Sequence, residues 1–323
     1  RTHDYIRISL IDKCNLNCIY CNPNNQLFNT LKNNSILSYE ELIRLISILV
    51  RDCEVRKIRF TGGEPLIRKD ILKFFQMLSD VKKVFPFEIG ITTNGTLLED
   101  KISLLHSFGF NRLNISLDSL NKNKFIAITG KDLLDTTLRA IQKASQYDFD
   151  KVKINSVIIK NINDDEIINF VEHFQNSKLN IRFIEYMPFN GNGWDDSKFI
   201  SWKEMKSFIE TKYHLQEIES DGNVAKDFLV EGTNLKVSFI SSISNHFCDS
   251  CNRLRITASG KIKNCLFAQS EEVNLRSMLA DYSVSDYEIA KTISDSLKSK
   301  WFKHPSADEL AKLKHNNMMS IGG

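Results

Sequence analysis

Six short apolar runs alternate with helical patterns between residues 6 and 187, and this alternation limits the folds that are open to the chain. The runs are rich in β-branched and aromatic residues, whereas the stretches between them have apolar residues at helical spacing. Strands and helices that alternate in this way form parallel βαβ units, in which each helix carries the chain back across the sheet. The predicted strands are residues 6–11, 57–62, 88–93, 112–118, 152–159 and 180–187.

Polar residues on one side of these strands favour a barrel over an open sheet. A parallel sheet that is covered on both faces has strands that are apolar throughout. Five of the strands instead place polar residues at alternate positions: Arg7 and Ser9; Lys57, Arg59 and Thr61; Thr92 and Asn94; Asn114, Ser116 and Asp118; Lys151, Lys153 and Asn155. In a β/α barrel one strand face points to the axis, and a polar lumen is unfavourable unless a polar ligand fills it. We therefore predict an α/β fold, a partial (β/α)6 TIM-like barrel that holds a polar ligand.

The pattern changes after about residue 213, where the alternation stops. A hairpin is expected in "VEGTNLKVSFI" with its turn near 232–234, followed by helices at about 271–280 and 285–300. We therefore divide the chain into a barrel at 1–212 and a C-terminal region at 213–323. Within the barrel, Ser38 and Asp164 are the predicted N-caps of two helices.

The net charge, the apolar runs and the cysteines limit the kind of protein that this can be. The net charge is +3, no signal peptide is visible, and no apolar run approaches the roughly 20 residues of a membrane span. We expect a cytoplasmic protein that binds neither membrane nor nucleic acid. The seven cysteines then indicate metal or redox chemistry rather than disulfides. Cys53 stands alone after an apolar run and is expected to be a core thiol.

Three other cysteines lie together in "CNLNCIYC", directly after the first predicted strand. A structural zinc site needs four ligands, so zinc at Cys14, Cys18 and Cys21 (the first trio) would need a fourth from elsewhere. A 4Fe–4S cluster held by three thiolates keeps one iron open to another ligand. The position after a strand predicts that this loop lies at the C-terminal mouth of the barrel, where such folds carry their active sites.

The second trio is Cys248, Cys251 and Cys265, within "CDSCNRLRITASGKIKNC". Zinc is one interpretation, with His246 or Asp249 as the fourth ligand. The other is a second three-cysteine 4Fe–4S cluster, whose open iron could bind a substrate directly.

The first trio, with Tyr20 before its last cysteine, resembles the motif of the radical S-adenosylmethionine (SAM) enzymes. The sequence "TGGEP" at 61–65 is similar to their second motif. The resemblance implies that the open iron binds the amino and carboxylate groups of SAM, which is cleaved reductively to a 5′-deoxyadenosyl radical. The glycines would let backbone approach the methionine moiety, and Glu64 would lie near its amino group.

Within that superfamily the chain resembles the GTP 3′,8-cyclase family, lyases that act in molybdenum cofactor biosynthesis. The resemblance rests on "RISL", "KIRFTGGEPLIR", "TTNG", "NISLDSL", "RFIEYMPF", "NGW", "FCDSCNRLRITASGKIKNCLF" and the terminal "GG". It implies two 4Fe–4S clusters that face each other across the barrel, with GTP between them and guanine on the open iron of the second. Asn22 departs from the family, which usually carries methionine there.

The resemblance also implies roles for individual residues. The SAM site would be lined by Tyr20, Gly63, Glu64, Ser116 and Met187. The GTP contacts would be Arg7, Lys57, Arg59, Thr92, Lys153, Arg182, Arg253, Leu254 and Arg255. Arg7, Arg253 and Arg255 would be catalytic. Because a triphosphate carries several charges, basic residues must offset its desolvation. Simple alternation puts Arg182 and Met187 on opposite strand faces, so one of them needs a bulge or a loop position.

For the reaction, the resemblance implies that the adenosyl radical abstracts hydrogen from C3′ of GTP. The carbon radical then adds to guanine C8, and one electron and one proton complete (8S)-3′,8-cyclo-7,8-dihydroguanosine 5′-triphosphate. An external electron donor, a homodimer and cyclic pyranopterin monophosphate synthase as the next enzyme are also implied. The tail at Gly322 and Gly323 would reach into the active site.

Two alternatives stay open. A radical SAM enzyme that modifies peptides would usually have more C-terminal cysteines and would not need so many basic residues in the lumen. A non-enzymatic module with zinc at both trios and a nucleic-acid-binding face is disfavoured by the charge of +3 and by the absence of an exposed basic run.

Overall fold

The computed structural model describes residues 3–21, 35–189, 192–220, 224–245, 247–268, 273–312 and 318–321. Asn22, His246, Gly322 and Gly323 lie outside the described residues. The strands are β1 Tyr5–Ser9, β2 Lys57–Thr61, β3 Glu88–Thr93, β4 Arg112–Ser116, β5 Lys151–Ile158, β6 Asn180–Glu185, β7 Leu215–Ile218, β8 Lys226–Val230, β9 Lys236–Ile240, β10 Arg253–Ile256 and β11 Ile262–Lys263. The helices are α1 Tyr39–Asp52, α2 Ile71–Val84, α3 Ile102–Ser107, α4 Lys122–Thr129, α5 Leu134–Ala144, α6 Ile167–Phe174, α7 Trp202–Glu210, α8 Arg276–Ala280, α9 Asp286–Leu297, α10 Ala307–Lys312 and α11 Met318–Ile321.

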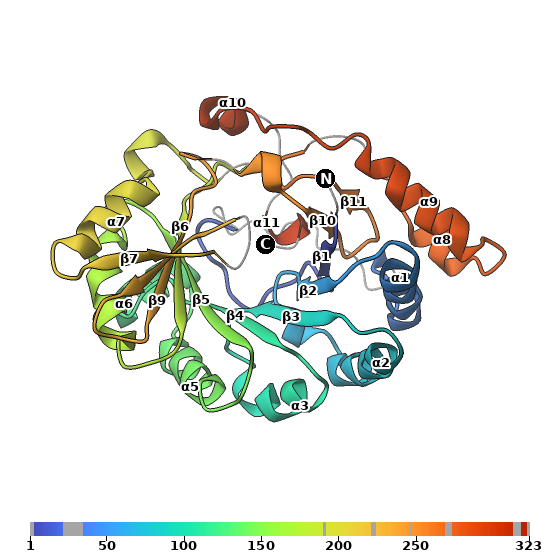
Figure 1. Cartoon of the computed structure of the whole chain (residues 1–323), viewed down its shortest axis with the longest axis horizontal. Helices are drawn as coiled ribbons and strands as arrows, with labels where there is room; N and C mark the ends of the chain where they lie inside the picture. The colour runs from blue at the N-terminus through green and yellow to red at the C-terminus, as the bar shows by residue number, and fades with distance from the viewer. Residues whose placement is uncertain are drawn as a thin grey trace.

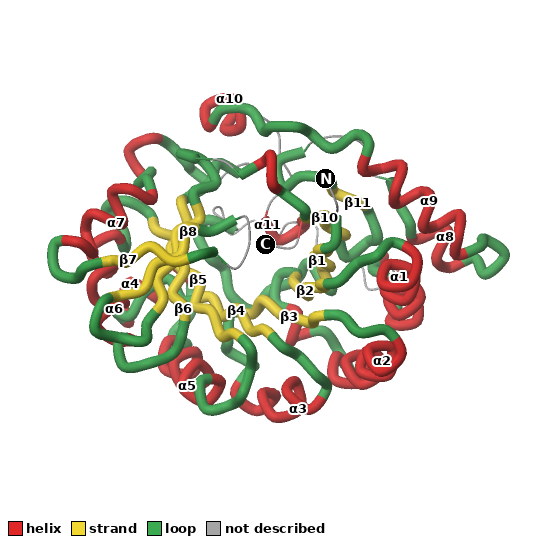
Figure 2. Tube along the Cα trace, in the orientation of Figure 1, coloured by secondary structure: helices red, strands yellow, loops and turns green. Residues whose placement is uncertain are grey.

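Within these ranges all the strands form one sheet, in the order β11-β10-β1-β2-β3-β4-β5-β6-β9-β8-β7. The strands from β10 to β9 in this order are parallel to their neighbours, and hairpins with β11 and β8 continue the two edges. Figure 1 shows the sheet curving around a central space, with α1, α2, α3, α5, α6 and α7 on the outside. Figure 2 shows the same arrangement, with α1, α2, α3, α5, α6 and α7 outside the strands and α11 near the centre of the view.

The predicted partial barrel is confirmed, and it is wider than expected. All six predicted strands are present as β1 to β6. Two strands from beyond residue 212 extend the parallel part, because β10 pairs with β1 and β9 pairs with β6. The connection from β6 to β9 contains α7, but the β7–β8 hairpin separates that helix from β9, and among the described residues between β9 and β10 the only helical element is the 3₁₀ turn at Cys248–Ser250. Neither strand therefore continues the simple strand–helix alternation, which gave no sign of them. The region after residue 212 therefore supplies both edges of the barrel.

The predicted helix caps and hairpin turn agree with the structure, except that Asp164 is not an N-cap. Ser38 caps α1 in a capping box with Glu41. Asp164 is not an N-cap: it opens a 3₁₀ turn whose cap position is Asn163, and its carboxylate accepts a hydrogen bond from the Asn161 backbone N–H at 2.7 Å. The hairpin of β8 and β9 turns at Gly232, where φ is 75°. The last two predicted helices are shorter than expected, as α8 and α9.

The two faces of the strands separate apolar from polar side chains. Ile6, Ile8, Ile58 and Phe60 are fully buried in the core between sheet and helices. Cys53 packs against this core, as expected for a structural thiol. None of the helices in the described ranges has both the length and the hydropathy that a transmembrane span requires.

Buried carboxylates fasten the loops at the C-terminal ends of the strands. Glu185 ends β6 and is fully buried, and it accepts hydrogen bonds from the backbone N–H groups of Trp202, Ile243 and Ser244 at 3.0, 2.9 and 3.0 Å. One side chain therefore joins the end of β6 to the start of α7 and to the segment before the second trio. A buried carboxylate needs such donors, because burial without them is costly.

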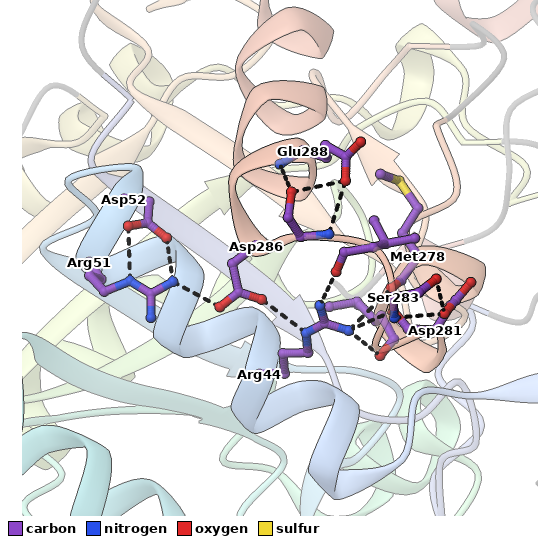
Figure 3. Close-up of polar contacts among 11 residues, drawn as sticks. Arg44, Arg51, Asp52, Met278, Asp281, Ser283, Asp286 and Glu288 are labelled. Atoms are coloured by element: carbon purple, nitrogen blue, oxygen red, sulfur yellow. Dashed lines mark hydrogen bonds and ion pairs between the residues drawn. The ribbon is translucent and has the colours of Figure 1, made fainter.

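Arg44 on α1 holds the C-terminal helices against the barrel (Figure 3). Its guanidinium pairs with Asp286 at 3.1 Å and donates to the carbonyls of Leu279 and Asp281 at 3.1 and 3.0 Å. Arg51 contacts the other carboxylate oxygen of Asp286 at 2.9 Å. The side chain of Arg44 is only 13% exposed, so these contacts are largely shielded from water. This network fixes α8 and α9 on α1.

Arg44→Ala should therefore lower the free energy of unfolding by about 2 kcal/mol, because it removes the donor to the Leu279 carbonyl and one of the two cations that contact Asp286. Urea unfolding followed by circular dichroism measures the loss. Arg139→Ala is the matched control: its pair with Glu99 is exposed, and the change should cost less than about 1 kcal/mol. Equal losses in the two variants would contradict the docking role of Arg44.

Candidate active site

All six cysteines of the two trios line one cavity of about 450 Å³ inside the curved sheet. The first trio follows the C-terminal end of β1. Cys248 and Cys251 precede β10, and Cys265 follows β11, which is antiparallel to β10. Because β10 is parallel to β1, the second trio lies at the opposite end of the barrel. The length of β1 between the two ends is roughly 13 Å at about 3.3 Å per residue.

The loop of the first trio rests on the "TGGEP" turn through backbone contacts. The N–H of Gly63 donates to the carbonyl of Ile11, and the N–H of Glu64 donates to that of Lys13, both at 2.8 Å. A Cβ atom on Gly63 would lie 2.2 Å from the Lys13 oxygen and 2.9 Å from the Cys14 nitrogen. Glycine is therefore required because the cysteine loop itself approaches so closely. Gly63 also lines the cavity, as predicted for the SAM site.

The expectation for Glu64 needs correction. Its side chain is fully buried and does not line the cavity. One oxygen accepts from the Leu66 N–H at 3.0 Å and the Thr93 hydroxyl at 2.8 Å, and the other accepts from the Asn94 N–H at 2.7 Å. Glu64 thus joins the turn to the end of β3, and its side chain does not reach the cavity. Burial raises its pKa to about 7, against the effect of these three hydrogen bonds.

Tyr20 and Asn94 connect the first trio to the rest of the barrel. The Tyr20 hydroxyl donates to Asp118 at 2.6 Å, and Asp118 also accepts from the Val157 N–H at 2.8 Å. The Asn94 amide donates to the Cys14 sulfur at 3.8 Å. Hydrogen bonds of this kind orient thiolate ligands and tune a bound cluster. Asp118 was expected only on the lumen face, and its partnership with Tyr20 has no sequence signal.

The environments of the thiols fit a group that supplies positive charge. Burial raises the pKa values of Cys14, Cys18 and Cys21, so the free thiols stay protonated until a metal replaces the protons. Burial would also raise the pKa of Cys251, but the charges of Arg253 and Lys300 outweigh it and lower that pKa to about 7. Nearby cations therefore favour the thiolate of Cys251, whereas the first trio would become thiolate when a bound metal supplies positive charge.

A single zinc ion fits this arrangement poorly. In the part of the chain that the structure describes, no three His, Cys, Asp or Glu side chains are placed to hold one metal ion. Asp249, one candidate for a fourth ligand, is exposed and does not line the cavity. Three thiols without a fourth ligand remain consistent with an iron–sulfur cluster that has an open iron.

Between the trios the cavity is strongly basic. Among the described lining residues, nine are arginine or lysine and three are acidic; the basic ones are Arg7, Lys57, Arg59, Arg112, Lys153, Arg182, Arg253, Arg255 and Lys300. Burial, together with neighbouring arginines, lowers the pKa of Arg7 to about 10 and that of Arg182 to about 9, and it lowers the pKa of Arg255 as well. Crowded, desolvated cations favour a polyanionic ligand.

Tyr5 belongs to this basic cluster and is missing from the predicted site. The Nε–H of Arg59 donates to its hydroxyl oxygen at 2.7 Å. Burial alone would raise the pKa of Tyr5, but the charges of Arg59 and Arg7 outweigh it and lower that pKa to about 7. Gly90 leaves room for the arginine, since a Cβ there would lie 3.0 Å from the Arg59 Cζ. The alternation that identified Arg7 also places Tyr5 on the lumen face, so the sequence did contain this signal.

Polar atoms in the lumen indicate that a ligand completes it. The Thr92 hydroxyl oxygen and the Asn114 side-chain carbonyl oxygen are buried and have no hydrogen-bond partner among the described residues. Both residues line the cavity. A buried polar group without a partner is unfavourable, so these atoms are suited to contact a bound polar molecule.

The structure brings most of the predicted site residues together. The cavity lining includes Tyr20, Gly63, Ser116 and Met187 from the SAM set, and Arg7, Lys57, Arg59, Thr92, Lys153, Arg182, Arg253 and Arg255 from the GTP set. Arg182 and Met187 both reach it because β6 ends at Glu185 and Met187 lies in the loop beyond.

Three predicted positions besides Glu64 lie outside the lining. The Leu254 side chain packs in the hydrophobic core with 1% of its surface exposed and does not line the cavity. Ser9 and Lys151, expected in the lumen, are absent from the lining. Ser9 is buried and its hydroxyl donates to the Ile11 carbonyl.

Comparison with known proteins gives two family matches. Residues 8–174 match the Radical SAM superfamily, and residues 179–306 match Molybdenum Cofactor Synthesis C.

Curated relatives match all or nearly all of the chain. Molybdenum cofactor biosynthesis protein 1 of Dictyostelium discoideum is 45% identical over 327 residues, which are 100% of this chain and 51% of that protein, so the chain spans about half its length. GTP 3′,8-cyclase of Thermodesulfovibrio yellowstonii is 42% identical, over 93% of this chain and 92% of that protein. The mitochondrial GTP 3′,8-cyclase of Arabidopsis thaliana is 39% identical, over 100% and 82%.

Solved structures support the fold. Streptococcus suis SuiB bound to S-adenosylmethionine has a TM-score of 0.64 at 16% identity, over 96% of this chain and 68% of that chain. Native anSMEcpe with bound AdoMet has a TM-score of 0.50 at 19% identity, over 64% and 58%.

Gly63→Ala should disrupt the first trio, because the new Cβ must displace the Lys13 carbonyl and with it the cysteine loop. Iron retained after anaerobic reconstitution should fall to about half of the wild-type content, with the second trio still loaded. Gly232→Ala is the control, since a Cβ at that hairpin turn meets nothing within 4 Å. Full iron content in the Gly63 variant would show that the cysteine loop tolerates the displacement.

Proposed function

We infer that this chain, which belongs to the radical SAM superfamily and within it to the GTP 3′,8-cyclase family, converts GTP to (8S)-3′,8-cyclo-7,8-dihydroguanosine 5′-triphosphate in molybdenum cofactor biosynthesis. Family membership supports the use of SAM and an iron–sulfur cluster. The observation that carries the proposal is that both trios line one cavity with a basic lumen between them. A triphosphate substrate matches that lumen in charge.

The six cysteines would hold two 4Fe–4S clusters, the first supplying the 5′-deoxyadenosyl radical from SAM and the second binding guanine. The number of clusters is part of the proposal. Its support is that each trio offers three thiols to the same cavity.

The chain's own residues would position the substrate. Arg7, Arg59 and Arg255 lie on adjacent strands and in register, so they present guanidinium groups at one level of the lumen. Their fork geometry suits phosphate oxygens. Holding GTP rigidly between the two ends would bring C3′ within reach of the adenosyl group.

The alternatives are less well supported. A peptide substrate gives no reason for nine basic residues in one lumen.

Several expectations from the sequence stay predictions. They are the external electron donor, the homodimer, cyclic pyranopterin monophosphate synthase as the next enzyme, a cytoplasmic location and the division of the chain at residue 212. The role of Gly322 and Gly323 also stays a prediction. Ile321, directly before them, is buried against Phe189, Phe267 and Leu310 beside the cavity.

The proposal is tested by anaerobic incubation of the reconstituted protein with GTP, SAM and reductant. We expect about eight irons per chain, 5′-deoxyadenosine, and the cyclic nucleotide in equal amount. Arg255→Ala should lower the cyclic product on the order of 10²-fold, and lower 5′-deoxyadenosine less, because its guanidinium faces the substrate lumen rather than the first trio.

Arg56→Ala serves as the control, because this arginine is exposed just before β2 and does not line the cavity. If both products fell equally in the Arg255 variant, Arg255 would have no separate part in cyclisation. If the wild-type protein bound zinc and no iron, the proposed function itself would be wrong.

Tyr5 predicts a pH dependence of GTP binding. Above pH 7 its phenolate would compete with the triphosphate for Arg59, whereas the neutral phenol below pH 7 does not. Wild-type affinity should therefore fall relative to Tyr5→Phe by on the order of tenfold, or about 1.4 kcal/mol, as pH rises through 7. Calorimetric titration with GTP measures the effect.

Ionisation of GTP itself affects both proteins alike, so the difference between the two profiles isolates Tyr5. Tyr39→Phe is the matched control, since the Tyr39 hydroxyl donates to the Lys69 carbonyl away from the cavity. Parallel profiles for wild type and Tyr5→Phe would rule out the phenolate as a competitor.

A further inference from the structure

Lys300 reaches the cavity from the segment after α9, and its ammonium group is fully engaged there. Its nitrogen contacts the Cys251 sulfur at 3.6 Å, the Cys251 carbonyl at 3.2 Å and the Arg253 carbonyl at 2.6 Å. An ammonium group has three N–H donors, so these contacts use all of them. Most lysine side chains extend their ammonium group into water. The ammonium group of Lys300 instead points at the sulfur of Cys251.

The two trios differ in the donors that approach their sulfurs. Cys14 accepts from neutral groups, the Leu16 N–H at 3.4 Å and the Asn94 amide at 3.8 Å. Cys251 accepts from a charged ammonium group. A second cation stands nearby, because the guanidinium of Arg253 lies 4.9 Å above the Phe247 ring and its charge also acts on Cys251. Charge-assisted hydrogen bonds are about twice as strong as neutral ones.

The segment that carries Lys300 is fixed from two sides. On its outer side α9 is held on α1 by Arg44 and Arg51 through Asp286 (Figure 3). On its inner side the amide of Asn264, the neighbour of Cys265, donates to the Ser296 carbonyl and to the Ser299 hydroxyl at 2.5 and 2.9 Å. The position of Lys300 is therefore coupled to both cysteine loops of the second trio.

We propose that Lys300 is a positioning residue of the second trio: its N–H···S hydrogen bond to Cys251 raises the reduction potential of the cluster bound there. The inference rests on the proposed function, because it requires a cluster at the second trio. A hydrogen bond to a thiolate withdraws electron density from the iron and favours the reduced state. The bonds from Lys300 to the Cys251 and Arg253 carbonyls also fix the backbone that presents Arg253 to the lumen.

The test is an anaerobic redox titration of the holoenzyme followed by electron paramagnetic resonance. In Lys300→Met the transition of one cluster should shift to lower potential while the other stays in place. Lys300→Arg retains charge and donors and should restore most of the shift. Lys298→Met is the matched control, because that lysine lies on the same segment, is 80% exposed and pairs with Asp295.

The iron content distinguishes a wrong proposed function from a wrong inference about Lys300. If the wild-type protein held only one cluster, the proposed function would fail before Lys300 is tested. If Lys300→Met kept full iron and wild-type potentials, the inference about Lys300 would be overturned. Should the methionine variant lose iron, Lys300→Gln replaces it: this side chain keeps a neutral donor, and a potential equal to wild type there would overturn the charge-assisted role.

Discussion

Strand β10 pairs in parallel with β1, with Tyr5 opposite Arg253 and Arg7 opposite Arg255. This pairing has two consequences for the site. Because the two strands are parallel, their N-terminal ends lie at the same end of the barrel. The second trio lies at that end, beside the start of β10, whereas the first trio follows the C-terminal end of β1. The pairing also adds two arginines to the lumen beside Arg7 and Arg59. Without β10 the barrel would lack one wall and one set of thiols, so the second proposed metal site and part of the basic lumen depend on this backbone ladder.

The lumen concentrates positive charge in a place where water is scarce. Burial and mutual repulsion lower the pKa values of Arg7, Arg182 and Arg255. Tyr5 lies in the same cluster and accepts a hydrogen bond from Arg59. A triphosphate would have the charge that such a cluster favours. The Thr92 and Asn114 oxygens, which have no hydrogen-bond partner among the described residues, would offer it polar contacts.

Much of the site was predictable because it follows local periodicity. The i, i+2 spacing placed Arg7, Arg59, Thr92, Ser116 and Lys153 in the lumen, and the same rule applied to Tyr5 would have included it. Contacts between residues far apart in the sequence could not be predicted from local periodicity. Glu64 faces backbone amides rather than a ligand, Tyr20 pairs with Asp118 98 residues later, and Lys300 reaches Cys251 from a helix end. The pairing of β9 and β10 with the barrel edges also escaped the strand–helix pattern, because the β7–β8 hairpin stands between α7 and β9 and the described residues between β9 and β10 form no α-helix.

The central claim is that two thiol-bound clusters stand at opposite ends of one cavity. Anomalous diffraction at the iron edge, from crystals of the reconstituted protein grown without oxygen, tests it most directly. We predict two strong iron peaks, one beside Cys14, Cys18 and Cys21 and the other beside Cys248, Cys251 and Cys265, separated by roughly 13 to 20 Å, the length of the strands with their loops. A single peak, a zinc signal at either trio, or two peaks that do not face the same cavity would contradict the claim.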